Sequence, residues 1–180
     1  MPEVIRDGRV ELDDWRFLGL PGTQARSAAS EEDPQLAAES IVVPLAAWKE
    51  RREELVRNLG SVGVWLGPTD DPAEIAADLE RLPLVAIHFP KFTDGRGYSC
   101  AALLRNRYRY RGELRAIGDV GRDQLFYLKR CGFDAFALAP NRDPHAALAS
   151  LHDFSVRYQA SVDDPQPLHR KRLASAAVRG

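Results

Sequence analysis

The sequence predicts an α/β protein in which short buried strands alternate with helices. Strand-like apolar runs begin near residues 41, 63, 84, 113 and 134, so consecutive starts lie 21 to 29 residues apart. Each interval leaves room for one helix, which is typical of right-handed βαβ units in a parallel sheet. We therefore expect repeated βα units and a mainly parallel sheet of about five strands. The spacing does not separate a doubly wound sheet from a partial (β/α) barrel.

A small β-hairpin is expected before these units. Val4-Ile5 and Arg9-Val10 flank Asp7-Gly8, a dipeptide typical of two-residue hairpin turns. The segment from Pro21 to Glu39 has no clear period, and we interpret it as a linker. The expected organisation is a hairpin and linker over residues 1–39, an α/β domain over 40–160 and a flexible basic tail over 161–180.

The βα units follow from apolar patterns and helix signals. Asp71-Pro72 is typical of a helix start, and Gly132 is typical of a helix end. The expected strands cover residues 41–45, 63–66, 84–89, 113–117 and 133–138. The expected helices cover residues 47–59, 72–82, 97–107, 122–131 and 144–159.

The composition excludes several classes of protein. The chain has 180 residues, of which 44% are hydrophobic, and only two cysteines. Two cysteines rule out a disulfide framework and an iron–sulfur cluster held by four thiolates, and they fit a reducing cytoplasm. No secretory signal, membrane-spanning run, metal-ligand spacing or nucleotide-cofactor fingerprint is found in the sequence, so no intrinsic cofactor is evident.

Charge is distributed unevenly along the chain. The net charge is only −1, but residues 1–90 carry −8, residues 91–130 carry +6 and residues 131–180 carry +1. A positive middle segment can attract an anionic ligand or an acidic protein surface. A solvated helix face is the simpler alternative, and the charge count alone does not separate them.

The loop after the third expected strand is the main candidate for a ligand site. Ligands of parallel sheets bind beyond the carboxyl ends of the strands, and this loop is the longest and most polar. Lys91, Arg96, Tyr98 and Ser99 lie on it or at the following helix start, where free N–H groups favour an oxyanion. In the alternative reading the loop is a structural turn, in which Asp94 caps and pairs with Arg96.

Four residues near this loop are catalytic candidates. His88 and Asp119 end neighbouring strands, Asp94 lies on the loop, and Cys100 lies in the first helical turn, which tends to lower a thiol pKa. Against these roles, His88 can be a structural histidine and Cys100 a packing residue.

Arginine and tyrosine alternate immediately afterwards. Arg105 and Arg107, followed by Arg109 and Arg111, favour a surface that docks to an acidic protein, with Arg122 on a neighbouring loop. The same interleaving occurs in nucleic-acid binders, but the low overall charge and the lack of a recognised module disfavour nucleic acid.

Three motifs carry a resemblance to a known family. They read Phe-Pro-Lys-Phe-Thr-Asp-Gly-Arg-Gly-Tyr-Ser from residue 89, Gly-Glu-Leu-Arg-Ala-Ile-Gly-Asp-Val from residue 112 and Arg-Cys-Gly-Phe-Asp-Ala-Phe from residue 130. With these motifs the chain resembles, from about Ile41 to Gln159, the bacterial family of domain of unknown function 934, whose members are labelled oxidoreductases of sulfite reduction. The resemblance implies a role beside sulfite or nitrite reductase.

The residues and the resemblance together leave three candidate functions. The first is an accessory component of assimilatory sulfite reduction, which the missing cofactor fingerprints favour over electron transfer by the chain itself. The second is a small enzyme acting on an anionic substrate at the strand carboxyl ends. The third, which the sequence disfavours, is a nucleic-acid binder. Homo-oligomerisation stays open.

Overall fold

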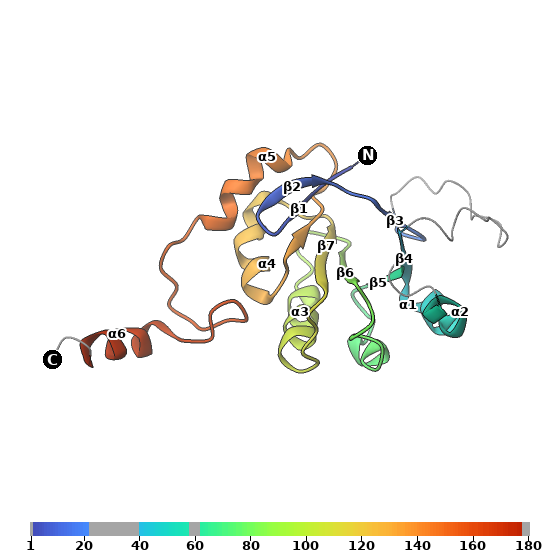
Figure 1. Ribbon diagram of the computed structural model, residues 1–180. Coiled ribbons are helices and arrows are strands. Elements are labelled where there is room, and N and C mark those ends of the chain that lie inside the picture. Colours follow the sequence, from blue (N-terminus) through green and yellow to red (C-terminus); the bar gives the residue numbers. More distant parts are fainter. Residues whose placement is uncertain (1, 22–39, 58–61, 178–180) are drawn as a thin grey trace.

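The computed structural model describes residues 2–21, 40–57 and 62–177, and its central feature is one curled sheet of eight strands (Figure 1). The strands are β1 (Glu3–Arg6), β2 (Arg9–Leu12), β3 (Trp15–Phe17), β4 (Ser40–Pro44), β5 (Val62–Leu66), β6 (Leu84–Phe89), β7 (Glu113–Gly118) and β8 (Ala135–Phe136). Their order across the sheet is β2-β1-β8-β7-β6-β5-β4-β3. The strands from β3 to β8 pair in parallel, whereas β1 is antiparallel to both β2 and β8.

The expected sheet of about five strands is wrong. The structure has eight strands in a mixed sheet, mostly parallel with an antiparallel edge, curled into a half-barrel. Five strands do begin within about a residue of the expected positions. The other three are the hairpin strands, which join this sheet by pairing β1 with β8, and β3, which is only three residues long. Pairing between the two ends of the chain leaves no periodic signal in the sequence.

The hairpin turn explains how the chain enters this sheet. Asp7 and Gly8 have φ angles of 48° and 76°, and a two-residue type I′ turn needs positive φ at both central positions. Ile5 of β1 then lies beside Phe136 of β8 in antiparallel register. The hairpin therefore extends the parallel sheet instead of forming a separate unit.

A two-residue link shows how strongly the sheet curls. The two edge strands, β2 and β3, are connected by Asp13 and Asp14 alone. Leu12 and Trp15 can thus be at most about 11 Å apart, since consecutive Cα atoms are separated by 3.8 Å. In a flat sheet, seven strand spacings of about 4.8 Å would hold the edges more than 30 Å apart. The link bridges the open side of the half-barrel.

The sheet has a convex face covered by helices and a concave inner face. Val64, Ile87 and Ala116 belong to the main core cluster, which also contains buried residues of α3 and α4. The alternate residues of the same strands point the other way, and Ala86 and Ile117 pack with Trp65 in a second, smaller cluster. Alternation along each strand therefore divides the side chains between two environments.

The helices are shorter and more broken than expected. They are α1 (Leu45–Glu50), α2 (Arg52–Arg57), η2 (Pro72–Ile75), α3 (Arg96–Asn106), η3 (Arg122–Gln124), α4 (Leu125–Cys131), α5 (Pro144–Ala147), η4 (Leu148–His152) and α6 (Leu168–Ala177). The helix expected over 144–159 ends at His152, and the expected flexible tail contains α6, which stands away from the sheet (Figure 1). Residues 22–39 of the expected linker and the last two residues of the expected 47–59 helix lie outside the described residues.

A buried ion network holds the inner face against the two-residue link. Arg115 is fully buried, and its Nη1 donates to both carboxylate oxygens of Asp13 at 2.8 and 2.9 Å. Its Nε donates to Glu113 at 2.6 Å, and Arg6 donates to the other oxygen of Glu113. Two cations therefore face two carboxylates inside the half-barrel, which compensates their desolvation.

Candidate functional site

The carboxyl edge of the sheet, where β6 and β7 end, carries the loop that was the main candidate for a ligand site. Asp94 pairs with Arg96, with 2.6 Å between Oδ2 and Nη2. The hydrogen bonds from Arg96 lower the pKa of Asp94 to about 2. The carboxylate of Asp119 accepts a hydrogen bond of 2.8 Å from the backbone N–H of Phe92. Both acidic side chains therefore bind the loop itself, and Arg96 is already paired.

Tyr98 and Ser99 lie in the first turns of α3, at the end of this loop. The Tyr98 hydroxyl accepts a hydrogen bond of 3.1 Å from Gln124 Nε2, and its ring packs against the rings of Phe89 and Tyr127. Tyr98 thus joins α3 to the start of α4, while Ser99 is exposed beside it. Burial raises the pKa of the Tyr98 hydroxyl.

His88 and Cys100 lie on opposite faces of the sheet. Ile87 and Phe89 belong to the helix-covered core, so His88 between them points to the concave face, where its ring meets Trp65 edge-on with centroids 5.9 Å apart. Cys100 packs on the helix-covered side, and burial raises its thiol pKa to about 12. Burial lowers the pKa of His88. The structure therefore does not bring these residues together as a nucleophile and base.

Lys91 and Arg122 are cations close to this loop at the carboxyl edge. Both are exposed, and neither forms an ion pair with any residue that the structure describes. They lie close to the backbone that Asp119 binds, so this part of the carboxyl edge presents two exposed positive charges.

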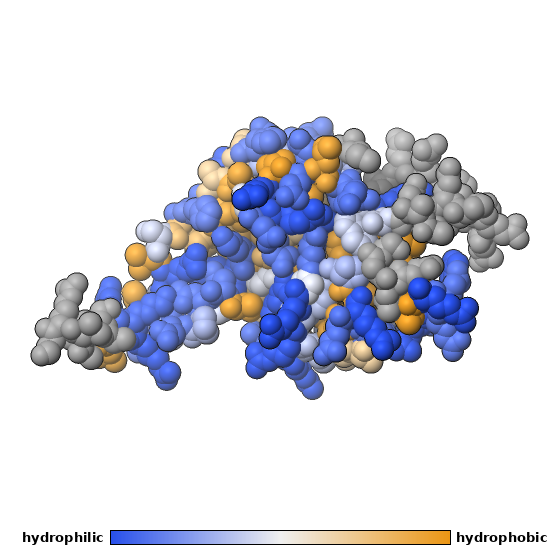
Figure 2. Space-filling model, viewed as in Figure 1, coloured by the Kyte–Doolittle hydropathy of each residue, from blue (hydrophilic) through white to orange (hydrophobic). Residues whose placement is uncertain are grey.

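The amino edge, where β6 and β7 begin, carries the rest of the arginine-rich segment. The eleven residues of α3 separate the two edges by about 16 Å, at 1.5 Å per residue. The stretch from His88 to Arg111 therefore does not form one face. In Figure 2 hydrophilic residues dominate the lower edge of the molecule around α3.

Arg105 holds the amino edge together and is not free to dock. Its Nε donates to the Gly132 carbonyl at 2.9 Å, and its Nη1 donates to the carbonyls of Tyr110 and Gly112 at 2.7 and 2.9 Å. Its Nη2 donates to Asp134 at 2.5 Å, and only 13% of the side chain is exposed. The guanidinium therefore fixes the loop between α3 and β7, and it joins that loop to the start of β8.

Tyr110 and Gly112 fix the same loop from inside. The Tyr110 hydroxyl lies 3.1 Å from the carbonyl oxygens of Leu82 and Glu113. A Cβ at Gly112 would lie 2.3 Å from that hydroxyl oxygen, so only glycine fits there. Arg109 has a φ of 57°, which is uncommon for a residue other than glycine. The loop is thus held in one strained conformation.

A hollow of about 660 Å³ opens between this loop and the loop before β6. Its lining includes the cations Arg81, Arg109 and Arg111, the acidic Glu80 and the ring of Tyr108. Among the described residues none of these three arginines forms an ion pair, and Arg107 beside them lies over the Tyr108 ring at 5.7 Å. We call Arg81, Arg107, Arg109 and Arg111 the arginine surface.

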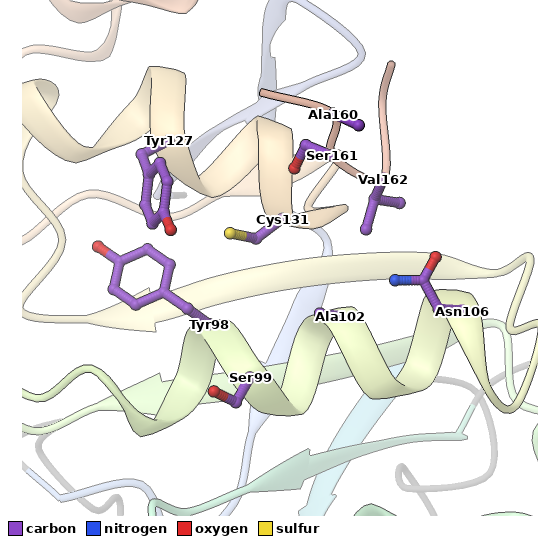
Figure 3. Close-up of a pocket in the computed structure, with 9 residues that line it drawn as sticks. All are labelled: Tyr98, Ser99, Ala102, Asn106, Tyr127, Cys131, Ala160, Ser161 and Val162. Atoms are coloured by element: carbon purple, nitrogen blue, oxygen red, sulfur yellow. The ribbon is translucent and has the colours of Figure 1, made fainter. Parts of the chain in front are cut away.

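A second hollow, of about 420 Å³, lies between α3 and α4 (Figure 3). Residues 160–162 close one side, and the side chains of Tyr98, Tyr127 and Cys131 point into it. Ser161 Oγ and Val162 N both donate to the Arg130 carbonyl, which holds this segment against α4. Burial raises the pKa of the Cys131 thiol, while a hydrogen bond from Tyr127 opposes the shift.

Among the residues that the structure describes, no group of three or more His, Cys, Asp or Glu side chains is placed to hold a metal ion. No helix in this part of the chain is long and apolar enough to cross a membrane.

Comparison with known proteins gives one family. Residues 63–169 match the model of the family described as "Bacterial protein of unknown function (DUF934)". The chain belongs to this family. Neither the curated proteins nor the solved structures yielded a match. The DUF934 match includes both ends of β6 and β7, the loop between α3 and β7 and the segment that closes the second hollow.

Arg81 is the residue of the arginine surface that the sequence analysis missed. In this DUF934 protein it precedes β6, as Arg111 precedes β7, and parallel neighbouring strands begin at the same edge. That correspondence was available in the sequence, since the two strands were expected at these positions. Arg115 was also missed, because a single arginine within an apolar run gives no sign of its partner Asp13.

Proposed function

We propose that this DUF934 protein is an accessory component of assimilatory sulfite reduction that docks to an acidic face of sulfite or nitrite reductase. The arginine surface is the contact region in this proposal. The resemblance of the sequence motifs to proteins labelled with sulfite reduction supports the choice of pathway, and the geometry of the amino edge supports docking.

One observation carries the proposal. Four exposed arginines gather on one edge without an ion pair to any described residue, on loops that Arg105 and Tyr110 hold in place. Guanidinium groups that have no ion pair can bind the carboxylates of a partner through paired hydrogen bonds. A fixed loop loses little conformational entropy when it docks. The carboxyl edge is less suited, because Arg96 is bound to Asp94.

We place this role in the cytoplasm. Cys100 and Cys131 are free thiols, and both are at least partly buried. Free thiols fit a reducing compartment.

Co-purification with the reductase tests the proposal. The tagged protein and sulfite reductase from the same source are mixed at low salt, and three variants are compared with the parent. The first variant reverses the charge at Arg107, Arg109 and Arg111, each changed to Glu. The second changes Lys91 and Arg122 to Glu at the carboxyl edge. The third, a control, changes Arg170 and Arg172 to Glu; both are exposed on α6, which stands away from the sheet.

The proposal expects the first variant to lose the reductase while the second and third keep it. All variants should keep the parent melting temperature, because the changed side chains form no ion pair among the described residues. Retention of the reductase by the first variant, or its loss only in the second, contradicts docking at the amino edge.

A further inference from the structure

The hollow at the amino edge is concave, and its rim carries part of the arginine surface. Residues 79–83 form one wall and residues 108–112 the other, and they precede β6 and β7. The lining includes three guanidinium groups that are unpaired among the described residues. We propose that this hollow binds a small organic polyphosphate, a ligand with an organic body and at least two phosphate groups.

Charge argues for at least two anionic groups. Arg81, Arg109 and Arg111 contribute three positive charges to the lining, and Glu80 is the acidic residue among them. These four side chains sum to a net charge of +2, and the guanidinium groups stand on both walls of the hollow, so a ligand with two anionic groups can pair with both walls at once. Two linked phosphate groups offer enough oxygen atoms to accept paired hydrogen bonds from guanidinium groups on both walls.

Size argues for an organic body. At about 660 Å³ the hollow lies within the range of roughly 300–1,000 Å³ that is usual for small-molecule sites. Pro83 and Tyr108, which are both partly exposed, contribute apolar surface to the lining. A bare phosphate or sulfite would leave most of this surface uncovered, whereas an organic group would bury it.

Rigidity argues for a preformed site. Arg105 donates to the carbonyls of Tyr110 and Gly112, and Tyr110 reaches across to the Leu82 carbonyl of the opposite wall. The two walls are therefore joined by hydrogen bonds at their base. Holding Arg109 at a φ of 57° has a free-energy cost, and such strain is concentrated at functional sites.

Calorimetric titration of the isolated, full-length protein tests the site. ADP, pyrophosphate, adenosine and sulfate are titrated at low ionic strength. We expect one ADP per chain, bound at least about tenfold more tightly than pyrophosphate, with sulfate and adenosine weaker still. Because no reductase is present, a negative result would leave the docking proposal untouched, and failure of docking would leave this one untouched.

Substitutions locate the ligand. Arg109→Gln and Arg111→Gln should each weaken ADP binding by roughly tenfold, the loss expected for a charge-assisted hydrogen bond. Arg9→Gln combined with Arg142→Gln removes two exposed charges elsewhere and should leave binding unchanged. Each variant is checked for an unchanged melting temperature, so that a folding defect is recognised.

Three results would overturn the inference. The first is the absence of measurable heat with millimolar ADP and pyrophosphate. The second is binding of pyrophosphate as tight as that of ADP, which would remove the organic body from the proposal. The third is ADP binding that survives both Arg109→Gln and Arg111→Gln, which would place the ligand outside this hollow.

Discussion

Cations gather at both the carboxyl and the amino edge of the sheet, but their partners differ. At the carboxyl edge Arg96 pairs with Asp94, and Asp119 holds the backbone of the same loop. At the amino edge Arg105 donates hydrogen bonds to three carbonyl groups and to Asp134, whereas the arginines around it form no ion pair with any described residue. The comparison teaches that the density of charge along a sequence does not show which charges are available to a ligand.

The reactivity of Cys100 gives the largest expected effect and tests whether the carboxyl edge holds an activated thiol. Its pKa of about 12 means that the thiolate fraction at pH 8 is on the order of a thousandfold below that of an ordinary cysteine. Alkylation by iodoacetamide should therefore be very slow in the folded protein and fast in urea. Rapid alkylation of Cys100 in the folded protein, located by mass spectrometry, would restore the carboxyl edge as a candidate catalytic site.

Arg105 and Arg96 provide a matched pair for stability. Arg105→Ala leaves the partly buried Asp134 without its cation and releases three carbonyl groups, so we expect a loss of roughly 3 kcal/mol in the free energy of unfolding. Arg96→Ala breaks a pair on the surface loop, and the loss in the free energy of unfolding should be much smaller. Urea denaturation measures both. Equal losses would remove the distinction between a structural and an exposed arginine.

The titration of Asp94 gives the smallest effect. Its folded pKa of about 2 lies below the ordinary value, so the Arg96 pair contributes stability above the unfolded pKa and loses it as pH falls through 2. NMR titration of the Asp94 carboxyl carbon should give a midpoint near 2, which returns toward 4 in Arg96→Ala. A midpoint near 4 in the parent protein would mean that Arg96 is free in solution.

Local signals predicted the parts of the fold that depend on nearby residues. Asp7-Gly8 predicted the hairpin turn, and apolar runs predicted where β4 to β7 begin. Local signals were insufficient for β3, which has three residues, and for the helix expected over 72–82, in which the 3₁₀ turn η2 is followed by irregular turns. The eight-stranded sheet itself depends on pairing β1 with β8, a contact between distant parts of the chain.

At the candidate site, too, contacts between distant parts of the chain could not be predicted. A structural turn in which Asp94 pairs with Arg96 was one of the two alternatives that the sequence left open, because the two residues are close in the chain. The bonds of Arg105 to Gly132 and Asp134 span 27 and 29 residues, and no pattern in the sequence marks them. From the sequence, Arg105 was therefore counted among the arginines of a docking surface, although it supports the loop that presents the others.

The affinity of the purified protein for purified reductase tests the central claim most directly. Titration at two salt concentrations should show binding that weakens as salt rises, since exposed charge pairs are screened. With Arg107, Arg109 and Arg111 reversed, the account predicts a dissociation constant at least about a hundredfold higher, while reversal of Lys91 and Arg122 leaves it unchanged. The same affinity in the parent and the amino-edge variant would contradict the account.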